Sequence, residues 1–572
     1  MDSKQIAIYL VLWSGFTSYL AVAETAIEQQ AEQIIQEQQQ RQQDLRERVE
    51  QQQKQHQPID IKPSPDTDKL IGGPCFDILA IEISGAAHMP ARIKKNLTAP
   101  FINQCIDLDK INQLLKTISH WYFEQGYVTS RAYVAAQDLS SEHLVITVVE
   151  GTIETIRLID PLSRINTSIA FPIDKDKRLN LRDIEQGLEQ INRLQSIQST
   201  MDIVPGQTPG SSVIQVNSQT SKPWVISLSR DNSGQQSTGE LMNSLFLGLD
   251  NPLGLNDYSY LSVQKDNANE SGQDSTSVSW HWDMPIGYWN MGLDVSYFDY
   301  LSTVNSIATQ FETSGKNVAQ TLFLSRILYR DQDSKIKLRT SLERKKSENF
   351  IEDVLLDNSR VLSIGNIGIE YDKYSADQSQ WQLALNYYRG LSLFGAPNDD
   401  RRLAGTPKAQ FDKFVARIDY QQYAAFTLSE TRQLPLLFQS KLQLQYSPDL
   451  LFGSEQVSIG SLYTVRGYKN SSIAASSGAY WRNTLTFPFQ PKWGGKLVKQ
   501  LNPFIAFDIG TIRDRSQRYS DDRYTQLMGW TSGVQVSGKH YSINLSYARP
   551  HNIPNWLSIS QEQWHFNLSL KY

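Results

Sequence analysis

An arginine and an aspartate in the C-terminal third of the chain could form a buried ion pair. Arg466 stands in the loop-like run V-R-G-Y at positions 465–468, where a flexible glycine could let the loop carry a permanent cation to a distant partner. Asp508 is the single carboxylate in the apolar, strand-like run at positions 504–510. A buried aspartate in a strand is costly unless a cation meets it or it faces water. We therefore predict that Arg466 and Asp508 pair; a plain surface turn at 465–468 is the alternative.

No residue pattern for catalysis or metal binding accompanies this pair. The eight histidines are scattered without metal-ligand spacing, and no G-x-S-x-G motif occurs. The run at 533–540 fits the P-loop spacing up to its last position, where His540 replaces the serine or threonine that would hold magnesium. We interpret Ser537 and Gly538 as a tight hairpin turn instead. The sequence thus predicts no enzyme, no cofactor and no metal site.

The composition excludes some classes of protein. The chain has 572 residues, of which 20% are charged, and a mean hydropathy of −0.42. Such polarity excludes a membrane protein built of helices but permits a transmembrane β-barrel, whose strands are apolar on only one face. The formal net charge of −5 gives no indication of a nucleic-acid partner.

The first 23 residues have the features of a secretory signal peptide. Lys4 precedes an apolar run at 6–20, and the A-V-A run at 21–23 supplies a small-x-small cleavage site. The apolar run is shorter than the roughly 20 residues that a spanning helix needs, which disfavours the alternative of a membrane anchor. We therefore expect an exported protein whose mature chain begins at Glu24.

The next segment is polar and periodic. Residues 24–56 are rich in glutamine, glutamate and arginine, with a sparse apolar stripe at three- and four-residue spacing. This pattern predicts a helix of roughly 50 Å, at about 1.5 Å per residue, which is too polar for lipid but suited to a water-filled lumen. A short coiled coil and a disordered tether are the alternatives. Residues 57–70 contain three prolines and are interpreted as an extended linker.

Two successive β-α-β-β units follow, at 71–151 and 152–220. Their predicted elements are a strand at 76–83, a helix at 108–123 and strands at 130–136 and 143–149, then a strand at 152–159, a helix at 181–194 and strands at 199–204 and 212–216. A generic small α+β fold is the alternative for either unit taken alone.

The sequence has two cysteines, both in the first unit. Cys75 precedes the first predicted strand and Cys105 precedes the first predicted helix. In an exported chain an even count predicts a disulfide, which on the chain-entropy model would stabilise the unit by about 3 to 4 kcal/mol. A metal site or redox pair would need further ligands or a C-x-x-C spacing.

The region 221–572 consists of short segments of alternating apolar and polar residues, separated by polar turns. The predicted strands are 225–229, 244–249, 258–263, 277–282, 291–298, 321–329, 335–342, 362–371, 381–388, 414–420, 437–446, 480–487, 504–509, 531–536, 542–547 and 564–572. The last strand places Phe566, Leu568, Leu570 and Tyr572 on one face and resembles the closing strand of bacterial outer-membrane barrels. We predict an all-β transmembrane barrel of about sixteen antiparallel strands; a large soluble sandwich or propeller is the alternative.

The loop and the strand of the predicted ion pair resemble a signature of protein-translocating outer-membrane barrels, in which a V-R-G-[FY] loop tip folds into the lumen and meets an F-x-D-x-G strand. The matching positions are Val465, Arg466, Gly467 and Tyr468 in the loop and Phe507, Asp508 and Gly510 in the strand. Ala506 stands where the pattern has its first phenylalanine, so the aromatics match less closely than the two charges. With its order of segments, the chain resembles the two-partner secretion transporters over nearly its whole length.

This resemblance implies a location and a mechanism. The barrel would lie in the outer membrane of a Gram-negative bacterium, with the two small domains as polypeptide-transport-associated (POTRA) domains in the periplasm and residues 24–56 as a plug. The POTRA domains would bind the N-terminal secretion domain of a large exoprotein by strand addition, and the exoprotein would pass outward unfolded. Outer-membrane lipids and, during biogenesis, the barrel assembly machinery are further implied partners.

Several functions compete with this one. A haemolysin, an adhesin and a contact-dependent toxin are alternative cargoes. An assembly factor or a diffusion pore of the same superfamily is the alternative function, which the predicted plug disfavours. A surface barrel without a transport role would need neither the paired domains nor an inward-folding Arg466 loop.

Overall fold

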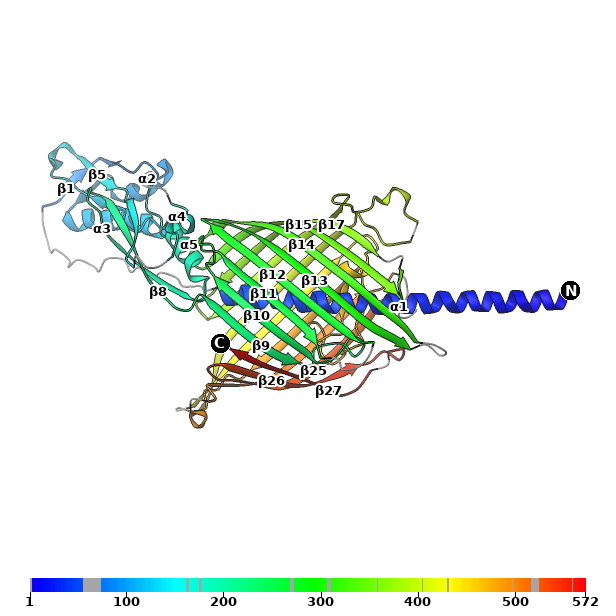
Figure 1. Ribbon diagram of the computed structural model, residues 1–572. Coiled ribbons are helices and arrows are strands. Elements are labelled where there is room, and N and C mark those ends of the chain that lie inside the picture. The colour runs from blue at the N-terminus through cyan, green and yellow to red at the C-terminus, as the bar shows by residue number, and fades with distance from the viewer. Residues whose placement is uncertain are drawn as a thin grey trace.

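The chain forms a long helix, two small α+β domains and a closed β-barrel (Figure 1). The computed structural model describes residues 3–54, 74–160, 164–173, 177–267, 272–305, 310–356, 359–403, 405–429, 432–495, 497–515, 524–557 and 559–572, and the side chains of the first helix from Glu28 onward.

Sixteen antiparallel strands make the barrel. They are β9 (Trp224–Asp231), β10 (Met242–Asp250), β11 (Tyr258–Asp266), β12 (Asp274–Ile286), β13 (Trp289–Asn305), β14 (Gln310–Arg330), β15 (Ser334–Ile351), β17 (Arg360–Tyr374), β18 (Ser379–Leu391), β19 (Asp412–Ser429), β20 (Arg432–Tyr446), β23 (Ser477–Thr486), β24 (Gln500–Arg513), β25 (Tyr524–Ser537), β26 (Tyr541–Asn552) and β27 (Gln563–Lys571). The two-residue strand β16 (Val354–Leu355) adds to the end of β15. The last strand pairs with the first, from Asn567 opposite Asp231 to Lys571 opposite Ser227, and so closes the wall.

Alternation along the strands separates an apolar outer face from a polar inner face. Leu568 and Leu570 on β27 and Tyr572 directly after it have exposed side chains, whereas Gln563 and His565 on the other face are buried. Every predicted strand segment overlaps one of the sixteen strands. Several strands are longer than predicted: β14 has 21 residues, whereas the alternating pattern covers only 321–329.

Helix α1 (Ser3–Gln53) runs through the barrel, and its N-terminal part projects from the end opposite the two small domains (Figure 1). It ends three residues before the end predicted for the segment 24–56. The predicted linker, 57–70, lies outside the described residues. Of the helices in the described part of the chain, none combines the length and the hydropathy needed to cross a membrane.

The first small domain contains more elements than predicted. Its elements are β1 (Phe76–Ile78), β2 (Ala80–Ser84), α2 (Ala91–Thr98), β3 (Gln104–Ile106), α3 (Leu108–Glu124), β4 (Arg131–Tyr133) and β5 (His143–Val149). The single strand predicted at 76–83 is broken at Leu79, so that β1 pairs with β3 in a separate sheet and β2 pairs in parallel with β5. The sequence prediction also missed α2 and β3.

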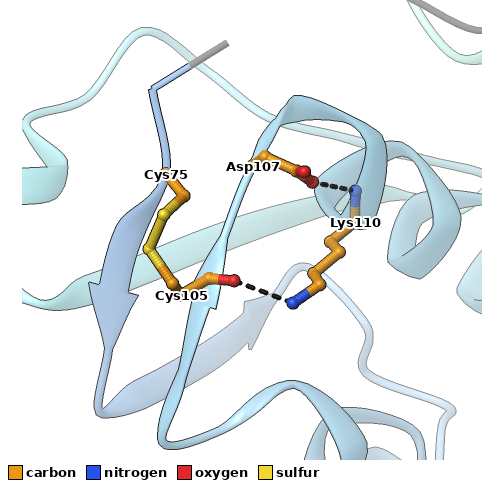
Figure 2. The surroundings of a disulfide bond; sticks show 4 residues. All are labelled: Cys75, Cys105, Asp107 and Lys110. Carbon is orange, nitrogen blue, oxygen red and sulfur yellow. Dashed lines mark hydrogen bonds between the residues drawn. A yellow bond between two sulfur atoms is a disulfide. The ribbon is translucent and has the colours of Figure 1, made fainter. Parts of the chain in front are cut away.

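A disulfide joins Cys75, directly before β1, to Cys105 on β3, across the short sheet that precedes helix α3 (Figure 2). Cys75 and Cys105 are bonded, with 5.3 Å between their Cα atoms. The Asp107 carboxylate accepts a hydrogen bond from the backbone N–H of Lys110 at 2.9 Å and so caps the helix. The Lys110 ammonium donates to the Cys105 carbonyl at 2.8 Å. The bond and the cap therefore fix the same corner of the domain.

The second small domain lies against one end of the barrel. Its elements are β6 (Thr152–Leu158), α4 (Thr167–Ala170), α5 (Leu181–Asn192), β7 (Ile197–Pro205) and β8 (Ser211–Thr220). The three strands have the order β6-β8-β7, with β6 parallel to β8. Helix α5 buries Ile184, Leu188 and Ile191 at three- and four-residue spacing, and its polar face meets the barrel.

The barrel lumen as the candidate functional site

The long loop between β20 and β23, residues 447–476, folds into the barrel. Within it β21 (Val457–Ile459) pairs with β22 (Ile473–Ala475). Their apolar side chains pack with Ile512 and Leu527, which point inward from strands β24 and β25. The loop is therefore attached to the wall by a small apolar core of its own.

Arg466 at the tip of this loop meets Asp508 on β24. The guanidinium Nε lies 2.5 Å from Oδ2 and Nη2 lies 2.6 Å from Oδ1, so the planar fork engages both carboxylate oxygens. The Arg466 backbone N–H donates to Oδ2 at 3.1 Å, and Nη2 donates to the Thr484 hydroxyl at 3.2 Å. Asp508 is 0% exposed and Arg466 7%. The pair is buried and multiply hydrogen-bonded.

Glycines make room for the loop tip. A Cβ on Gly529 of β25 would lie 1.9 Å from the Arg466 carbonyl oxygen, and one on Gly510 of β24 would lie 2.7 Å from Cγ2 of Val465. Gly467 itself has a φ of +97°, a backbone conformation that other residues rarely adopt. The close approach of loop and wall thus depends on glycine at all three positions.

Tyr468 fixes the other side of the tip. Its ring is fully buried, and its hydroxyl donates to the Met528 carbonyl at 2.7 Å and also contacts the Asn552 carbonyl. The Met528 N–H donates back to the hydroxyl at 3.2 Å. The structure therefore brings Val465, Arg466, Gly467, Tyr468, Asp508 and Gly510 together.

Phe507 is the exception among the residues selected from the sequence. It points to the outer face of the barrel and is 46% exposed, because neighbouring residues of a strand face opposite sides. Sequence reasoning also missed Arg482, which lies opposite Asp508 on β23 and donates to the carbonyls of Tyr463 and Leu462 at 2.7 and 3.3 Å. Arg482 is the only charged residue in the predicted strand 480–487, a signal that could have identified it.

Helix α1 and Lys54, the residue that follows it, form ion pairs with the wall that hold the helix in the lumen. The pairs are Glu32 with Arg360 at 2.6 Å, Glu47 with Arg417 and with Lys441 at 2.5 Å each, Lys54 with Asp372 at 3.3 Å, Glu50 with Arg339 at 3.6 Å and Arg46 with Asp294 at 3.8 Å. These contacts lie on several strands around the barrel, so the helix is tied to more than one side of it.

Glutamines connect the same helix to the inward-folded loop. The side-chain amides of Gln33, Gln36 and Gln40 donate to the carbonyls of Ser472, Gly453 and Ser458 at 2.9, 2.7 and 3.3 Å. Ala31, Ile34 and Ile35 make one apolar contact, with Phe298 and Tyr300 on β13. Leu45 and Val49 make a second one, in a cluster that includes Tyr258 and Tyr260 on β11. A cavity of about 410 Å³ between helix and wall shows that the helix does not fill the lumen.

The chain matches known protein families along most of its length. Residues 210–536 match the family described as haemolysin secretion/activation protein ShlB/FhaC/HecB. Residues 76–151 match the ShlB-type POTRA domain, and residues 152–205 match a second POTRA domain model. The chain belongs to the ShlB/FhaC/HecB family.

Individual members of this family are similar over nearly the whole chain. The outer membrane transporter CdiB of Dickeya dadantii (strain 3937) is 33% identical over 495 residues, which are 86% of this chain and 85% of the relative. The hemolysin transporter protein HpmB of Proteus mirabilis is 27% identical over 87% of this chain and 84% of its own length. The solved structure of CdiB from Escherichia coli has a TM-score of 0.84 at 30% identity and covers 95% of this chain and 99% of its own.

The family assignment confirms the fold and the class of function predicted from the sequence. The protein is an outer-membrane β-barrel transporter of two-partner secretion that exports large exoproteins, not an enzyme. The two small domains are POTRA domains in the periplasm, called POTRA1 and POTRA2 below. No group of three or more His, Cys, Asp and Glu residues within the described ranges could hold a metal ion.

In this transporter a continuous polar cluster joins POTRA2, the wall and helix α1. Arg193, at the end of α5, donates to Asp283 on β12 at 2.5 Å. The His281 ring lies 3.3 Å from Asp283 and 2.8 Å from Asp294. Asp294 in turn is the carboxylate paired with Arg46 of α1. POTRA2 and the helix in the lumen thus share partners on adjacent strands.

A second contact attaches POTRA2 to a periplasmic turn. Glu189 on α5 accepts from Lys335 at 2.6 Å and from Arg330 at 2.7 Å. Burial alone would raise the pKa of Glu189, but the two cations outweigh it and lower the pKa to about 2. The carboxylate is therefore charged at any pH of the periplasm.

Proposed function

We propose that this transporter recognises the N-terminal secretion domain of one large exoprotein in the periplasm and exports it as an unfolded chain through the lumen that α1 occupies. The observation that carries the proposal is the polarity of most contacts around α1, which are ion pairs and amide hydrogen bonds. Ion pairs and amide hydrogen bonds to the wall can be replaced by water or by another polar chain, so their net free energy is small compared with that of an apolar core. Such a helix can leave without unfolding the barrel.

The steps follow from the parts. The POTRA domains would bind the exoprotein by adding its strands to their sheet edges, and α1 would then leave the lumen. We assign to Arg466, Gly467 and Tyr468, with Asp508 and Gly510, the role of holding the inward loop against the wall while the chain passes. Folding of the exoprotein outside would give the direction of travel without a nucleotide.

For the exoprotein, we propose a toxin of the CdiA type. Two transporters similar to this chain are named CdiB, and both have a higher identity to it, 33% and 30%, than the relative named a hemolysin transporter, at 27%. A haemolysin is the second candidate. The proposal further includes residues 1–23 as a signal peptide, cleavage before Glu24, lipid contact over the outer face, and insertion by the barrel assembly machinery.

A cross-link between α1 and the wall tests whether the helix must leave. Gln30 donates to the Ser302 hydroxyl at 3.1 Å, so cysteines at these two positions can be bridged by a short bismaleimide. The native cysteines are in the disulfide and do not react. In proteoliposomes the bridged variant Gln30→Cys/Ser302→Cys is expected to stop export of the exoprotein's N-terminal segment.

The same double variant provides its own control. N-ethylmaleimide modifies both cysteines without joining them and is expected to leave export unchanged. Export at the same rate with either reagent would show that the exoprotein does not need the space that α1 occupies, and the proposed path would be wrong.

A further inference from the structure

One periplasmic connection of the barrel differs from the others in length and composition. The hairpin of β23 and β24 is joined by residues 487–499, here called the 487–499 loop, of which the structure describes 487–495 and 497–499. Strands β25 and β26 are joined by residues 538–540 alone. In Figure 1 the loop, drawn in orange near the C-terminus, projects away from the barrel wall on the side away from the POTRA domains. No described part of the chain covers its outer side chains.

Two large apolar side chains of this loop are almost fully exposed. Trp493, in the short 3-10 helix Lys492–Gly494, is 78% exposed, and Leu497 is 75% exposed. The loop backbone is nevertheless fixed: the Leu497 carbonyl accepts from the Tyr541 hydroxyl at 2.9 Å, and the Lys499 N–H donates to the Ser537 carbonyl at 2.9 Å. The two exposed side chains therefore stand on a loop whose backbone is hydrogen-bonded to the neighbouring hairpin.

The loop lies at the level where the apolar outer face of the barrel ends. The side chain of Leu501 on β24 points to the same outer face as the exposed Ile505, because residues at even spacing share a face of a strand. Leu501 also pairs with Phe489 across the base of the loop. Trp493 and Leu497 precede Leu501 in the chain and so lie past this end of the apolar face. Tryptophan is enriched at the boundary between hydrocarbon and water in membrane proteins.

The charge of this sector has one sign. The sequence from 487 to 507 contains three lysines and no aspartate or glutamate. The neighbouring turn adds Lys539, and the end of β27 adds Lys571. By contrast, the turn at 331–333 near POTRA2 contains two aspartates. A basic, apolar surface at this depth matches the anionic headgroups and acyl chains of a phospholipid leaflet.

We propose that the 487–499 loop is a membrane anchor, in which Trp493 and Leu497 insert into the periplasmic leaflet while Lys492 and Lys499 bind anionic phospholipid headgroups. The anchor would fix the position, along the membrane normal, of the β23–β24 hairpin that carries Asp508, because β24 begins directly after the loop. It does not depend on which exoprotein is exported.

Spin labels on the full-length protein in vesicles test this proposal. A nitroxide on Trp493→Cys is expected to be accessible to oxygen but shielded from a polar nickel complex, and more so in phosphatidylcholine vesicles containing phosphatidylglycerol than in phosphatidylcholine alone. Leu403→Cys is the matched control, because Leu403 is also 75% exposed but lies at the other end of the barrel. Its label is expected to stay accessible to the nickel complex in both vesicles.

The lysines are tested in the same measurement. With Lys492→Gln and Lys499→Gln added to Trp493→Cys, the difference between the two vesicle compositions is expected to disappear, while heat-modifiable migration on gels reports an intact barrel. Equal nickel accessibility at positions 493 and 403 in both vesicles would overturn the proposal. A label at 493 that becomes shielded only when the exoprotein's N-terminal segment is added would also overturn it, since the loop would then be a cargo contact.

Discussion

Arg193 of POTRA2 and Asp283 of strand β12 form a buried ion pair at 2.5 Å, with both side chains less than a tenth exposed. Through His281 this pair adjoins Asp294, the carboxylate that faces Arg46 of helix α1. If POTRA2 moved and separated Arg193 from Asp283, the Asp283 carboxylate would compete with Asp294 for a hydrogen bond from His281. The structure therefore offers a physical route from the periplasmic domain to the helix in the lumen.

Replacing Arg193 by glutamine is expected to loosen POTRA2 from the barrel. Removing one partner leaves a buried carboxylate without its cation, at a cost of about 3 to 5 kcal/mol. Electron–electron distance measurements between a label on POTRA2 and one on the barrel are expected to give a broader distribution than in the wild type. Arg182→Gln is the control, since Arg182 pairs with Glu185 within α5 at 2.7 Å. An unchanged distribution in the Arg193 variant would mean that the pair does not hold the domain.

The helix in the lumen is expected to leave more often when Glu47 is replaced by glutamine. Glu47 is the shared partner of Arg417 and Lys441, so the variant removes the anion with which α1 holds these two cations of the wall. In planar bilayers the channel is expected to open more frequently, and deletion of residues 24–56 is expected to raise the conductance further. Asp44→Asn is the matched control, because Asp44 pairs with Arg48 of the same helix. Equal opening frequency in the two variants would contradict the role given to the wall contacts.

How much of the fold the sequence can reveal depends on where a strand lies. Within the membrane one face meets lipid and the other the lumen, so residues alternate and the strand is visible in the sequence. Beyond the lipid both faces are wet, and the outer half of β14, which includes the polar run at 312–317, loses this alternation. Strand existence was therefore predicted correctly while strand length was underestimated.

The same reasoning explains which site residues were found. Arg466 and Asp508 each stand as the one charge in an apolar or loop-like run, which is unusual enough to identify. His281 and Asp283 lie in a polar stretch whose alternation places them in the lumen, but nothing local shows that Arg193, ninety residues away, reaches Asp283. In POTRA1 the break at Leu79 depends on pairing with β3, a long-range contact that no local pattern contains.

The POTRA1–POTRA2 junction is expected to weaken in acid because of Glu150. Burial raises the pKa of this carboxyl, but hydrogen bonds from the ring and the N–H of His88, at 2.6 and 3.0 Å, and from Tyr122, at 2.9 Å, outweigh it and leave the pKa below its usual value. A lowered pKa stabilises the folded state above the unfolded value of about 4.3, and this contribution is lost as the pH falls through the folded pKa.

Glu150→Gln is therefore expected to lower the free energy of unfolding of the β5–β6 junction at neutral pH, with a difference from the wild type that shrinks below about pH 4. Hydrogen exchange of the β5–β6 junction in the full-length protein measures it. Glu124→Gln provides the comparison, since Glu124 pairs with His120 on the exposed face of α3. A difference that persists unchanged in acid would show that the effect of the Glu150 variant is not electrostatic.

Loss of the disulfide is expected to destabilise POTRA1 alone. Cys75 and Cys105 are 30 positions apart, and opening a loop of this size costs about 3 to 4 kcal/mol on the chain-entropy model. In the Cys75→Ser/Cys105→Ser variant, hydrogen exchange is expected to accelerate in β1, β3 and α3 but not in the barrel strands. Equal protection in both proteins would show that the Asp107 cap and the core suffice without the bond.

Replacing Arg466 or Asp508 is expected to reduce secretion sharply while leaving the barrel assembled. Breaking a buried pair costs about 3 to 5 kcal/mol, and the complete burial of Asp508 favours the upper part of this range. Lysine at 466 keeps the charge but cannot engage both carboxylate oxygens and the Thr484 hydroxyl together, so we expect Arg466→Lys to behave nearly as badly as Arg466→Ala. Secretion of the exoprotein and protease access to the 447–476 loop are the measurements.

The control and the coupling test use the same loop. Lys469 donates to the Asn232 carbonyl at 2.7 Å and lies 3.4 Å from the half-exposed Glu240, so Lys469→Gln is expected to secrete nearly as the wild type does. The double variant Arg466→Ala/Asp508→Asn removes both charges, and its loss is expected to be smaller than the sum of the two single losses, because neither group is then left unpaired. Additive losses would show that the two residues act separately. Wild-type secretion in both single variants would show that this loop tip is a turn without a role in export.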